Sequence, residues 1–209
     1  MPKANLIPPY GGELVNLIVT GKERDELVAR VSRLPSIKIS MRAQCDLELL
    51  ATGGFSPLDR FMDKSTYERV LDEMRMDGGT LWPLPITLTA SPDELPTVGS
   101  ELVLRSALND PLAIMKLEEV FSWSPEKEAR LAYGSNDARH PMVSEMARWG
   151  KVCISGELKV INLPKYYDFV ESDHILMPHR FEHLTHFGRG TADFHKIVVF
   201  GQVDDLQFT

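Results

Sequence analysis

The chain has 209 residues, of which 43% are hydrophobic and 25% charged, and its formal net charge is −7. A sequence of this length and composition is typical of a globular protein with one large domain, or one domain with a short appendage. The acidic balance disfavours nucleic acid as a partner, because phosphate binding depends on clustered positive charge. No run of about 18 apolar residues and no signal peptide are present, so we expect a cytoplasmic protein that does not bind a membrane.

The first half of the sequence predicts helices around one short strand. It opens with an extended arm over residues 2–12, where three prolines and a Gly-Gly pair disfavour regular structure. Residues 37–41 alternate apolar and polar side chains, which indicates a half-buried strand. Elsewhere, apolar side chains at three- and four-residue spacings predict helices. These predicted helices cover residues 22–34, 45–51 and 63–75.

From Gly79 onward the pattern changes to short β-like runs separated by turns, which predicts a sheet or a compact barrel. The runs cover residues 85–90, 101–105, 111–117 and 151–163. A helical insert over residues 126–133 and 141–149 interrupts them, and a last helix near 177–187 with a strand at 197–200 follows. We therefore predict an α+β fold, a small mixed β-barrel decorated with helices.

Few residues stand out as candidates for chemistry. The glycine spacing of Rossmann and P-loop phosphate sites is absent, and so is a signature around a nucleophilic serine or cysteine. Cys45 and Cys153 are too few for a disulfide framework, and we expect both to be buried core thiols in a reducing compartment. The acidic pair Glu118-Glu119 is expected to lie in a solvated turn rather than to serve acid–base catalysis.

Histidines concentrate near the C-terminus, where five of the six fall within the last 36 residues. His179, His183 and His186 are spaced by four and three, so a helix would place them on one face, where they could bind a divalent metal. The alternative is an ordinary solvated or interface surface, because the carboxylate or cysteine ligands and orienting partners of most metal sites are not evident. The metal stays unassigned, and no cofactor is predicted.

Three stretches of the sequence carry a family resemblance. They read PPYGGELV over residues 8–15, CDLELLATGGFSPLDRFM over residues 45–62 and LWPLPITL over residues 81–88. In content, order and spacing they resemble the N-terminal domain of ATP sulfurylase, also called sulfate adenylyltransferase, and weaker similarity continues to Pro178. The signature residues of the second stretch, which we expect to be structural, are Cys45, Asp46, Glu48, Gly53, Gly54, Phe55, Ser56, Pro57 and Leu58.

The resemblance implies that residues 1–178 form a PUA-like β-barrel domain and that residues 179–209 begin a nucleotide-binding catalytic domain. One departure lies inside the match, since Arg60 stands where the family usually has glycine. Another follows the last predicted strand, where residues 203–205 read VDD in place of the family's arginine and histidines, which bind the ATP phosphates and sulfate. Carboxylates at that place would repel both anions, so no catalytic residue is assigned.

Three functions stay open at this point. The first is a stand-alone sulfurylase-like domain of sulfur metabolism that is not catalytic by itself and acts in assembly or regulation. The second is one half of a split sulfate adenylyltransferase, completed by a separate sulfurylase catalytic domain as its partner. The third is a PUA-like module that binds RNA or another ligand. An isolated domain of this kind should leave an apolar face exposed, so we also expect a homo-oligomer.

Overall fold

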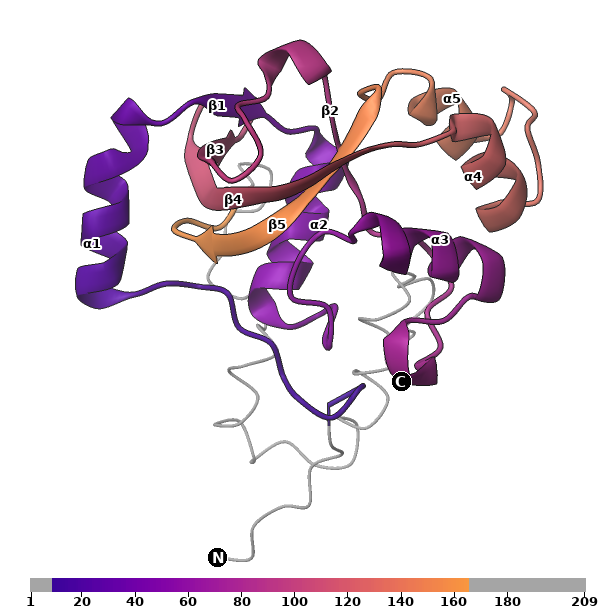
Figure 1. The fold of residues 1–209 in the computed structure, drawn as a ribbon, viewed down its shortest axis with the longest axis horizontal. Helices are drawn as coiled ribbons and strands as arrows, with labels where there is room; N and C mark the ends of the chain where they lie inside the picture. The colour runs from indigo at the N-terminus through magenta and orange to yellow at the C-terminus, as the bar shows by residue number, and fades with distance from the viewer. Residues whose placement is uncertain (1–8, 166–209) are drawn as a thin grey trace, which may run out of the picture.

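A curled five-stranded mixed sheet organises residues 9–165, the part of the chain that the computed structural model describes (Figure 1). Its strands are β1 (Ser36–Lys38), β2 (Leu88–Ala90), β3 (Glu101–Arg105), β4 (Pro111–Ser122) and β5 (Val152–Val160). They follow the order β1-β3-β4-β5-β2, with β1 parallel to β3 and the other neighbours antiparallel. The predicted α+β class is confirmed, and the expected barrel takes the form of a half-barrel.

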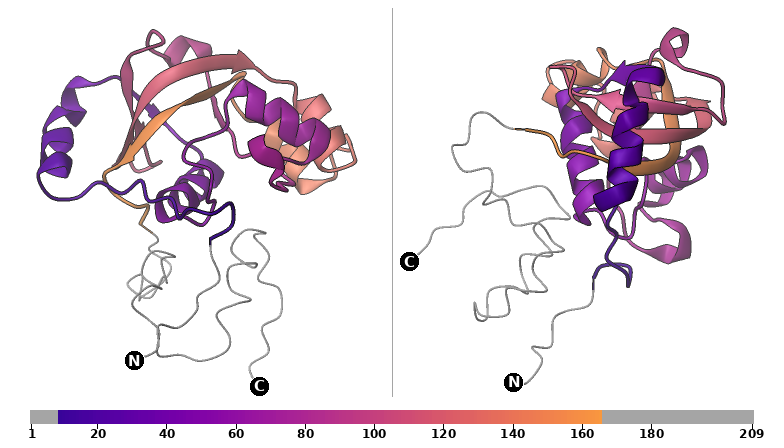
Figure 2. Two further views of the ribbon diagram at one scale, coloured as in Figure 1. Left: turned by 60° about the horizontal axis from the view of Figure 1, so that its bottom comes forward. Right: turned by 90° about the vertical axis from the view of Figure 1, so that its left-hand side faces the viewer.

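Five α-helices surround this sheet within the described residues. They are α1 (Gly21–Arg30), α2 (Met41–Thr52), α3 (Lys64–Glu73), α4 (Pro125–Ala132) and α5 (Pro141–Met146). Short 3₁₀ turns cover Val31–Arg33, Asp77–Gly79 and Pro92–Glu94. Each α-helix overlaps a helix that the sequence predicts. Figure 2 shows α1 at one end of the sheet and the group of α3, α4 and α5 at the other.

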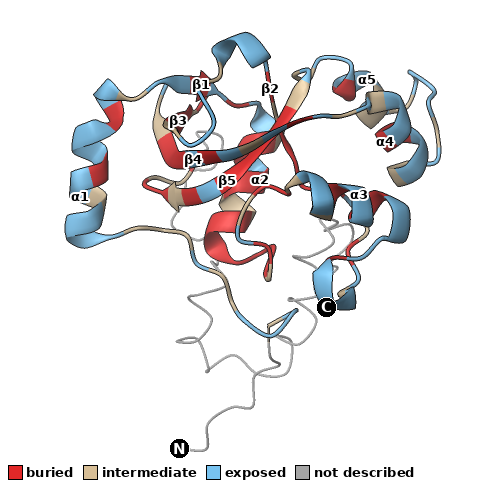
Figure 3. Cartoon of the chain, viewed as in Figure 1, coloured by how far each residue is buried: buried red, intermediate tan, exposed pale blue. Residues whose placement is uncertain are grey.

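Side chains of β3 alternate between two cores, one on each face of the sheet. Leu102 and Leu104 belong to the larger core, together with the buried side of α2. Val103 belongs to the smaller core, where it packs with Leu27 and Val31 of α1 and its following turn. Helices α1 and α2 therefore cover opposite faces. Figure 3 shows that burial concentrates in α2, β4 and β5, whereas α1, α3 and α4 expose their outer faces.

Helix α2 is central to the larger core because its sequence supplies both ends and an apolar face. The Ser40 hydroxyl accepts a hydrogen bond from the Ala43 N–H and caps the first turn. Gly53 ends the helix in the left-handed conformation, at a φ of 84°, which glycine adopts without steric cost. Between them, Leu47 and Leu50 are fully buried. The helix begins one turn earlier than the sequence predicts.

The long antiparallel pair of β4 and β5 is bent by a bulge between Leu117 and Glu119. Gly156 lies opposite this bulge, where a Cβ atom would overlap the Lys116 carbonyl oxygen. The prediction that Glu118 and Glu119 lie in a turn is wrong, since both belong to β4. The bulge breaks the alternation of apolar and polar side chains, and that break ended the predicted strand too early.

The two cysteines differ in their surroundings, although both are predicted to be buried. Cys153 lies in β5 and is fully buried, whereas Cys45 is exposed on α2. The reason is helical geometry, because Cys45 lies on the side of α2 away from Leu47 and Leu50. The prediction of a core thiol is therefore confirmed for Cys153 and wrong for Cys45.

Several predictions concern residues that the structure does not describe. The helix near 177–187, the strand at 197–200 and the histidines His179, His183 and His186 all lie outside residues 9–165. Among the described helices, none combines the length and the apolar character needed to cross a membrane. The cytoplasmic location stays a prediction.

Candidate functional site

The three stretches that carry the family resemblance meet at the C-terminal end of α2. The Val15 N–H donates to the Ser56 hydroxyl over 2.9 Å, which joins the first stretch to the second. The rings of Phe55 and Trp82 pack edge to face with centroids 5.8 Å apart, which joins the second stretch to the third. The Tyr10 hydroxyl of the first stretch donates to a backbone carbonyl oxygen of the third over 2.7 Å. Segments far apart in the sequence thus form one packed unit.

The turn after α2 depends on contacts that leave no room for a side chain at Gly53. A Cβ atom there would lie 2.6 Å from the Val15 carbonyl oxygen and 2.7 Å from a methyl carbon of Leu14. The Ser56 hydroxyl donates to the Gly53 carbonyl oxygen over 2.8 Å while it accepts from the Val15 N–H. Gly54 of the same turn is buried. These residues hold the N-terminal arm against α2.

The remaining signature residues belong to helix, turn and core. Phe55 and Leu58 are buried, Glu48 and Pro57 are half-buried, and Cys45 is exposed. None of the nine signature residues lines either of the two cavities described below. Their placement in helix, turn and core favours a part in holding the fold.

Asp46 has the most unusual environment among the signature residues. Its buried carboxylate pairs with Arg42 one turn earlier, with Asp46 Oδ2 and Arg42 Nε 3.4 Å apart. Burial raises the pKa of Asp46 to about 6, although the charge of Arg42 opposes the shift. The Arg42 guanidinium lies 4.2 Å from the centre of the Trp149 ring, which stacks on Trp123. Asp46 therefore belongs to a contact between α2 and the segment after α5.

A second buried carboxyl, that of Glu128 in α4, lies within the field of the same arginine. Glu128 is fully buried, and its Oε2 accepts a hydrogen bond of 3.0 Å from the Tyr67 hydroxyl of α3. Burial raises the pKa of Glu128, and the Tyr67 bond and the Arg42 charge only partly oppose the shift. Burial, together with the Glu128 carboxyl, also raises the pKa of Cys153 to about 12. The Cys153 thiol is thus protonated at neutral pH and unsuited to nucleophilic attack.

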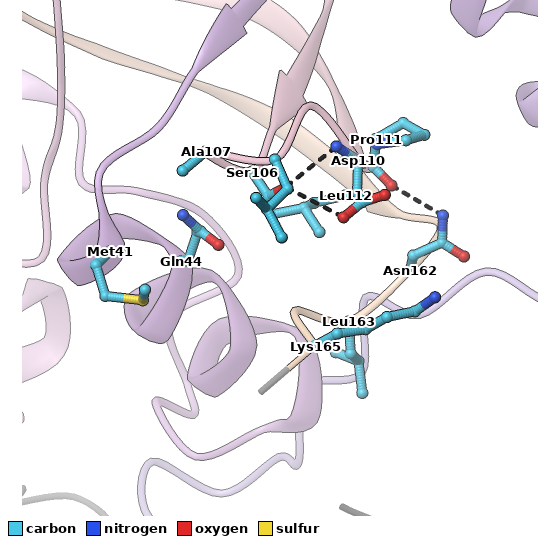
Figure 4. A pocket seen from close by; sticks show the side chains of 11 residues that line it. Met41, Gln44, Ser106, Ala107, Asp110, Pro111, Leu112, Asn162, Leu163 and Lys165 are labelled. Atoms are coloured by element: carbon cyan, nitrogen blue, oxygen red, sulfur yellow. Dashed lines mark hydrogen bonds between the residues drawn. The ribbon is translucent and has the colours of Figure 1, made fainter. Parts of the chain in front are cut away.

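Among the cavities of the described surface, two are each lined by one lysine and one carboxylate. The smaller has a volume of about 230 Å³ and is lined by Lys165 and Asp110, among others (Figure 4). The larger has a volume of about 680 Å³, borders α4 and α5, and is lined by Lys151 and Glu126, among others. Sites for polyanions gather several cations or N–H donors around one point. Neither cavity has that character.

The described residues hold no group of three or more His, Cys, Asp or Glu side chains that could bind a metal ion. The metal candidates that the sequence indicates, His179, His183 and His186, lie outside the described part of the chain. That prediction therefore stays open.

Sequence reasoning missed Arg42, Glu128 and Trp149, which surround Asp46 or share its arginine. The four-residue spacing of Arg42 and Asp46 on one helix could have indicated their pairing. Glu128 falls in the first turn of α4, where acidic residues are ordinarily solvated, so its burial has no local signal. The contact of Arg42 with Trp149 joins residues far apart in sequence, which no local pattern predicts.

Replacing Gly53 with alanine should destabilise the protein more than the same change at Gly134. Both glycines have a positive φ, so alanine at either position costs about 1–2 kcal/mol. Only at Gly53 would the new Cβ also collide with backbone, which adds roughly 1–3 kcal/mol. Urea unfolding of both variants measures the difference. Equal losses of stability would show that the close contact with Val15 is not required.

Replacing Asp46 with asparagine (D46N) should change how stability depends on pH. The pKa of Asp46 is raised from 3.8 to about 6, so the folded protein binds this proton more tightly than the unfolded chain. The resulting stabilisation is complete below about pH 4 and is lost as the pH rises through about 6. Relative to D46N, wild type should therefore lose about 2 kcal/mol of unfolding free energy between about pH 4 and pH 7.5.

Urea unfolding at both pH values checks this, with the exposed Asp93→Asn as the matched control. Parallel pH profiles for wild type and D46N would contradict the expected burial of the carboxyl.

Known proteins share the sequence of the described region. The profile of the PUA-like domain family matches residues 7–163. The sulfate adenylyltransferase of Halothermothrix orenii is 36% identical over 167 residues, which cover 78% of this chain and 44% of that protein. The sulfate adenylyltransferase of Phaeosphaeria nodorum is 38% identical over 170 residues, which cover 78% of this chain and 30% of that protein. This chain spans less than half the length of these relatives.

A solved structure shares the fold. The hexameric APS kinase from Thiobacillus denitrificans matches with a TM-score of 0.60 and 34% sequence identity, over 79% of this chain and 29% of that chain. The family match includes every helix and strand from α1 to β5, so the expected PUA-like fold is confirmed. The chain belongs to the PUA-like domain family, and the part described here resembles the N-terminal domain of sulfate adenylyltransferases.

Proposed function

We propose that this chain serves as the N-terminal PUA-like domain of a sulfate adenylyltransferase system in sulfate assimilation, and that it supports catalysis without performing it. The domain would cover residues 1–178, and residues 179–209 would begin a second unit. One observation carries the proposal: the region 36% identical to a sulfate adenylyltransferase uses its signature residues for helix, turn and core, and none of them lines either cavity.

The charges of the described residues support a non-catalytic role. Adenylyl transfer from ATP to sulfate brings two anions together, so cationic groups must converge on the reacting oxygens. Each of the two cavities is lined by a single lysine and a single carboxylate. Arg60, which stands where the related family usually has glycine, forms ion pairs with Asp59 and Glu118. A second polypeptide or domain would have to supply the cations.

The relatives indicate what that second part is. The matched region makes up 44% of the Halothermothrix protein, so more than half of that enzyme is further sequence. A separately encoded domain equivalent to that further sequence would complete a split enzyme. The solved relative is described as hexameric, which supports an oligomeric assembly for this chain. An RNA-binding role has less support, because the net charge of −7 disfavours phosphate contacts.

A fusion protein tests the proposal. It joins residues 1–165 of this chain to the part of the Halothermothrix sulfate adenylyltransferase that lies beyond its matched region. We expect the fusion to release pyrophosphate from ATP only when sulfate is present, whereas the 209-residue chain alone releases none. The reason is that the cations required for the transfer lie on the added part. A coupled assay of pyrophosphate release, at equal protein concentrations, gives the measurement.

The matched control is the Halothermothrix part without any PUA-like domain, which should be less active and less stable than the fusion. Mixing that part with the separate 209-residue chain tests the split-enzyme form, and turnover restored by mixing supports it. Turnover by the chain alone would contradict the proposal. So would a folded fusion that is no more active than the control.

A further inference from the structure

The smaller cavity lies where three segments of the chain meet (Figure 4). Met41 and Gln44 come from α2, residues 106–112 come from the β3–β4 turn and the start of β4, and Leu163 and Lys165 come from the segment that leaves β5. Its volume is about 230 Å³. Pockets for small molecules begin at roughly 300 Å³. The cavity therefore has the size to take a side chain of a partner rather than a separate ligand.

Two apolar side chains stand exposed at the rim of this cavity. Leu108 is 69% exposed and Met41 is 63% exposed, the highest values among the large hydrophobic residues that the structure describes. They belong to different elements, yet both line the same cavity. Exposed apolar side chains gathered around one hollow are typical of an interaction surface, because a partner that covers them removes apolar area from water.

Two polar side chains of the cavity wall, Gln44 and Asp110, have hydrogen-bond acceptors available. Gln44 is only 5% exposed, and its Nε2 donates to the Ile39 carbonyl oxygen, which leaves its Oε1 able to accept. Across the hollow, Asp110 accepts a long bond of 3.4 Å from the Ser106 hydroxyl (Figure 4). Within residues 9–165, no ion pair engages the Asp110 carboxylate. A side chain that enters between Gln44 and Asp110, on the wall that also carries Lys165, should therefore donate hydrogen bonds, as asparagine, glutamine and arginine do.

The segment after β5, which lines the cavity, lies where the match to the related proteins ends. The family match ends at residue 163, beside Leu163 and Lys165 of the cavity wall. More than half of the Halothermothrix relative's sequence lies outside the matched region. Resting on the function proposed above, we propose that the cavity with Met41 and Leu108 is the docking surface for the catalytic region of a sulfate adenylyltransferase. A donor-bearing side chain of that region enters the cavity, and its apolar neighbours cover Met41 and Leu108.

Another group of exposed apolar side chains provides an internal comparison. Tyr10, Met74, Leu81 and Leu84 are 38–54% exposed. The Tyr10 hydroxyl donates to the Leu81 carbonyl oxygen, and the Trp82 N–H donates to the Met74 carbonyl oxygen at the end of α3. None of the four lines either cavity. Met41 and Met74 are thus two exposed methionines of one chain, the first on the proposed docking surface and the second away from it.

Oxidation of these two methionines tests where the catalytic region docks. The rate of methionine oxidation by hydrogen peroxide follows exposure. We expect Met41 to oxidise at least about fivefold more slowly in the fusion protein than in the separate chain, while Met74 oxidises at a similar rate in both. Peptide mass spectrometry after timed exposure to peroxide gives both rates from one sample. Protection of Met74 without protection of Met41 would overturn the proposal.

A pair of substitutions separates docking from folding. Leu108→Glu (L108E) places a charge at the rim, and Val98→Glu (V98E) places the same charge at the opposite end of β3, on a side chain 54% exposed. Both variants should unfold like wild type in the separate chain, because both positions are exposed. In the fusion, L108E should restore fast oxidation of Met41 and lower the unfolding temperature, and V98E should do neither.

The outcomes distinguish this inference from the proposed function. A fusion without sulfate-dependent turnover would overturn the proposed function and the docking surface with it. Two results with an active fusion would overturn the docking surface and leave the proposed function standing. One is an unprotected Met41, and the other is an equal effect of L108E and V98E on Met41 oxidation and on the unfolding temperature.

Discussion

The close approach of the N-terminal arm to Gly53 determines how the helices and the sheet are joined. With no Cβ at this position, the Val15 carbonyl oxygen can lie against the turn that ends α2. The arm then continues to the sheet, where the Val19 N–H donates to the Val160 carbonyl oxygen over 2.9 Å. One segment thereby ties α2 to the end of β5, and both borders of the smaller cavity, α2 and the segment after β5, are held in place by it.

The buried carboxyls of Asp46 and Glu128 help to orient neighbouring helices rather than add net stability to the fold. Asp46 and Glu128 lie near one arginine, and burying such groups costs free energy that an apolar core would not lose. Their hydrogen bonds and ion pairs, however, have preferred distances and angles, whereas apolar contacts are not directional. The bond from Tyr67 to Glu128 couples α3 to α4, and Arg42 on the Trp149 ring couples α2 to the segment after α5. These contacts join the α4–α5 insert to α3 and α2.

Local patterns in the sequence predict much of this fold, and contacts between distant residues account for what they miss. Strand β3 has the predicted bounds, and α2 ends at the predicted glycine, because alternation and a left-handed cap are local properties. The prediction for Cys45 is wrong because cysteine is often a core residue, whereas this position of α2 lies on the exposed side of the helix. The contact of Arg42 with Trp149 and the cavity beside Lys165 arise only when the chain has folded, so no spacing in the sequence indicates them.

A small docking surface suits a domain that is covalently joined to its partner. One cavity and two apolar side chains offer much less contact than the ~800 Å² per partner of stable complexes between separate proteins. A short linker, however, gives the joined part an effective concentration in the millimolar range, so a weak contact suffices to orient it. The domain would then contribute position, and the partner would contribute the cations that ATP and sulfate require. A split enzyme loses the linker's advantage, so further contact area, such as that between copies in an oligomer, would have to replace it.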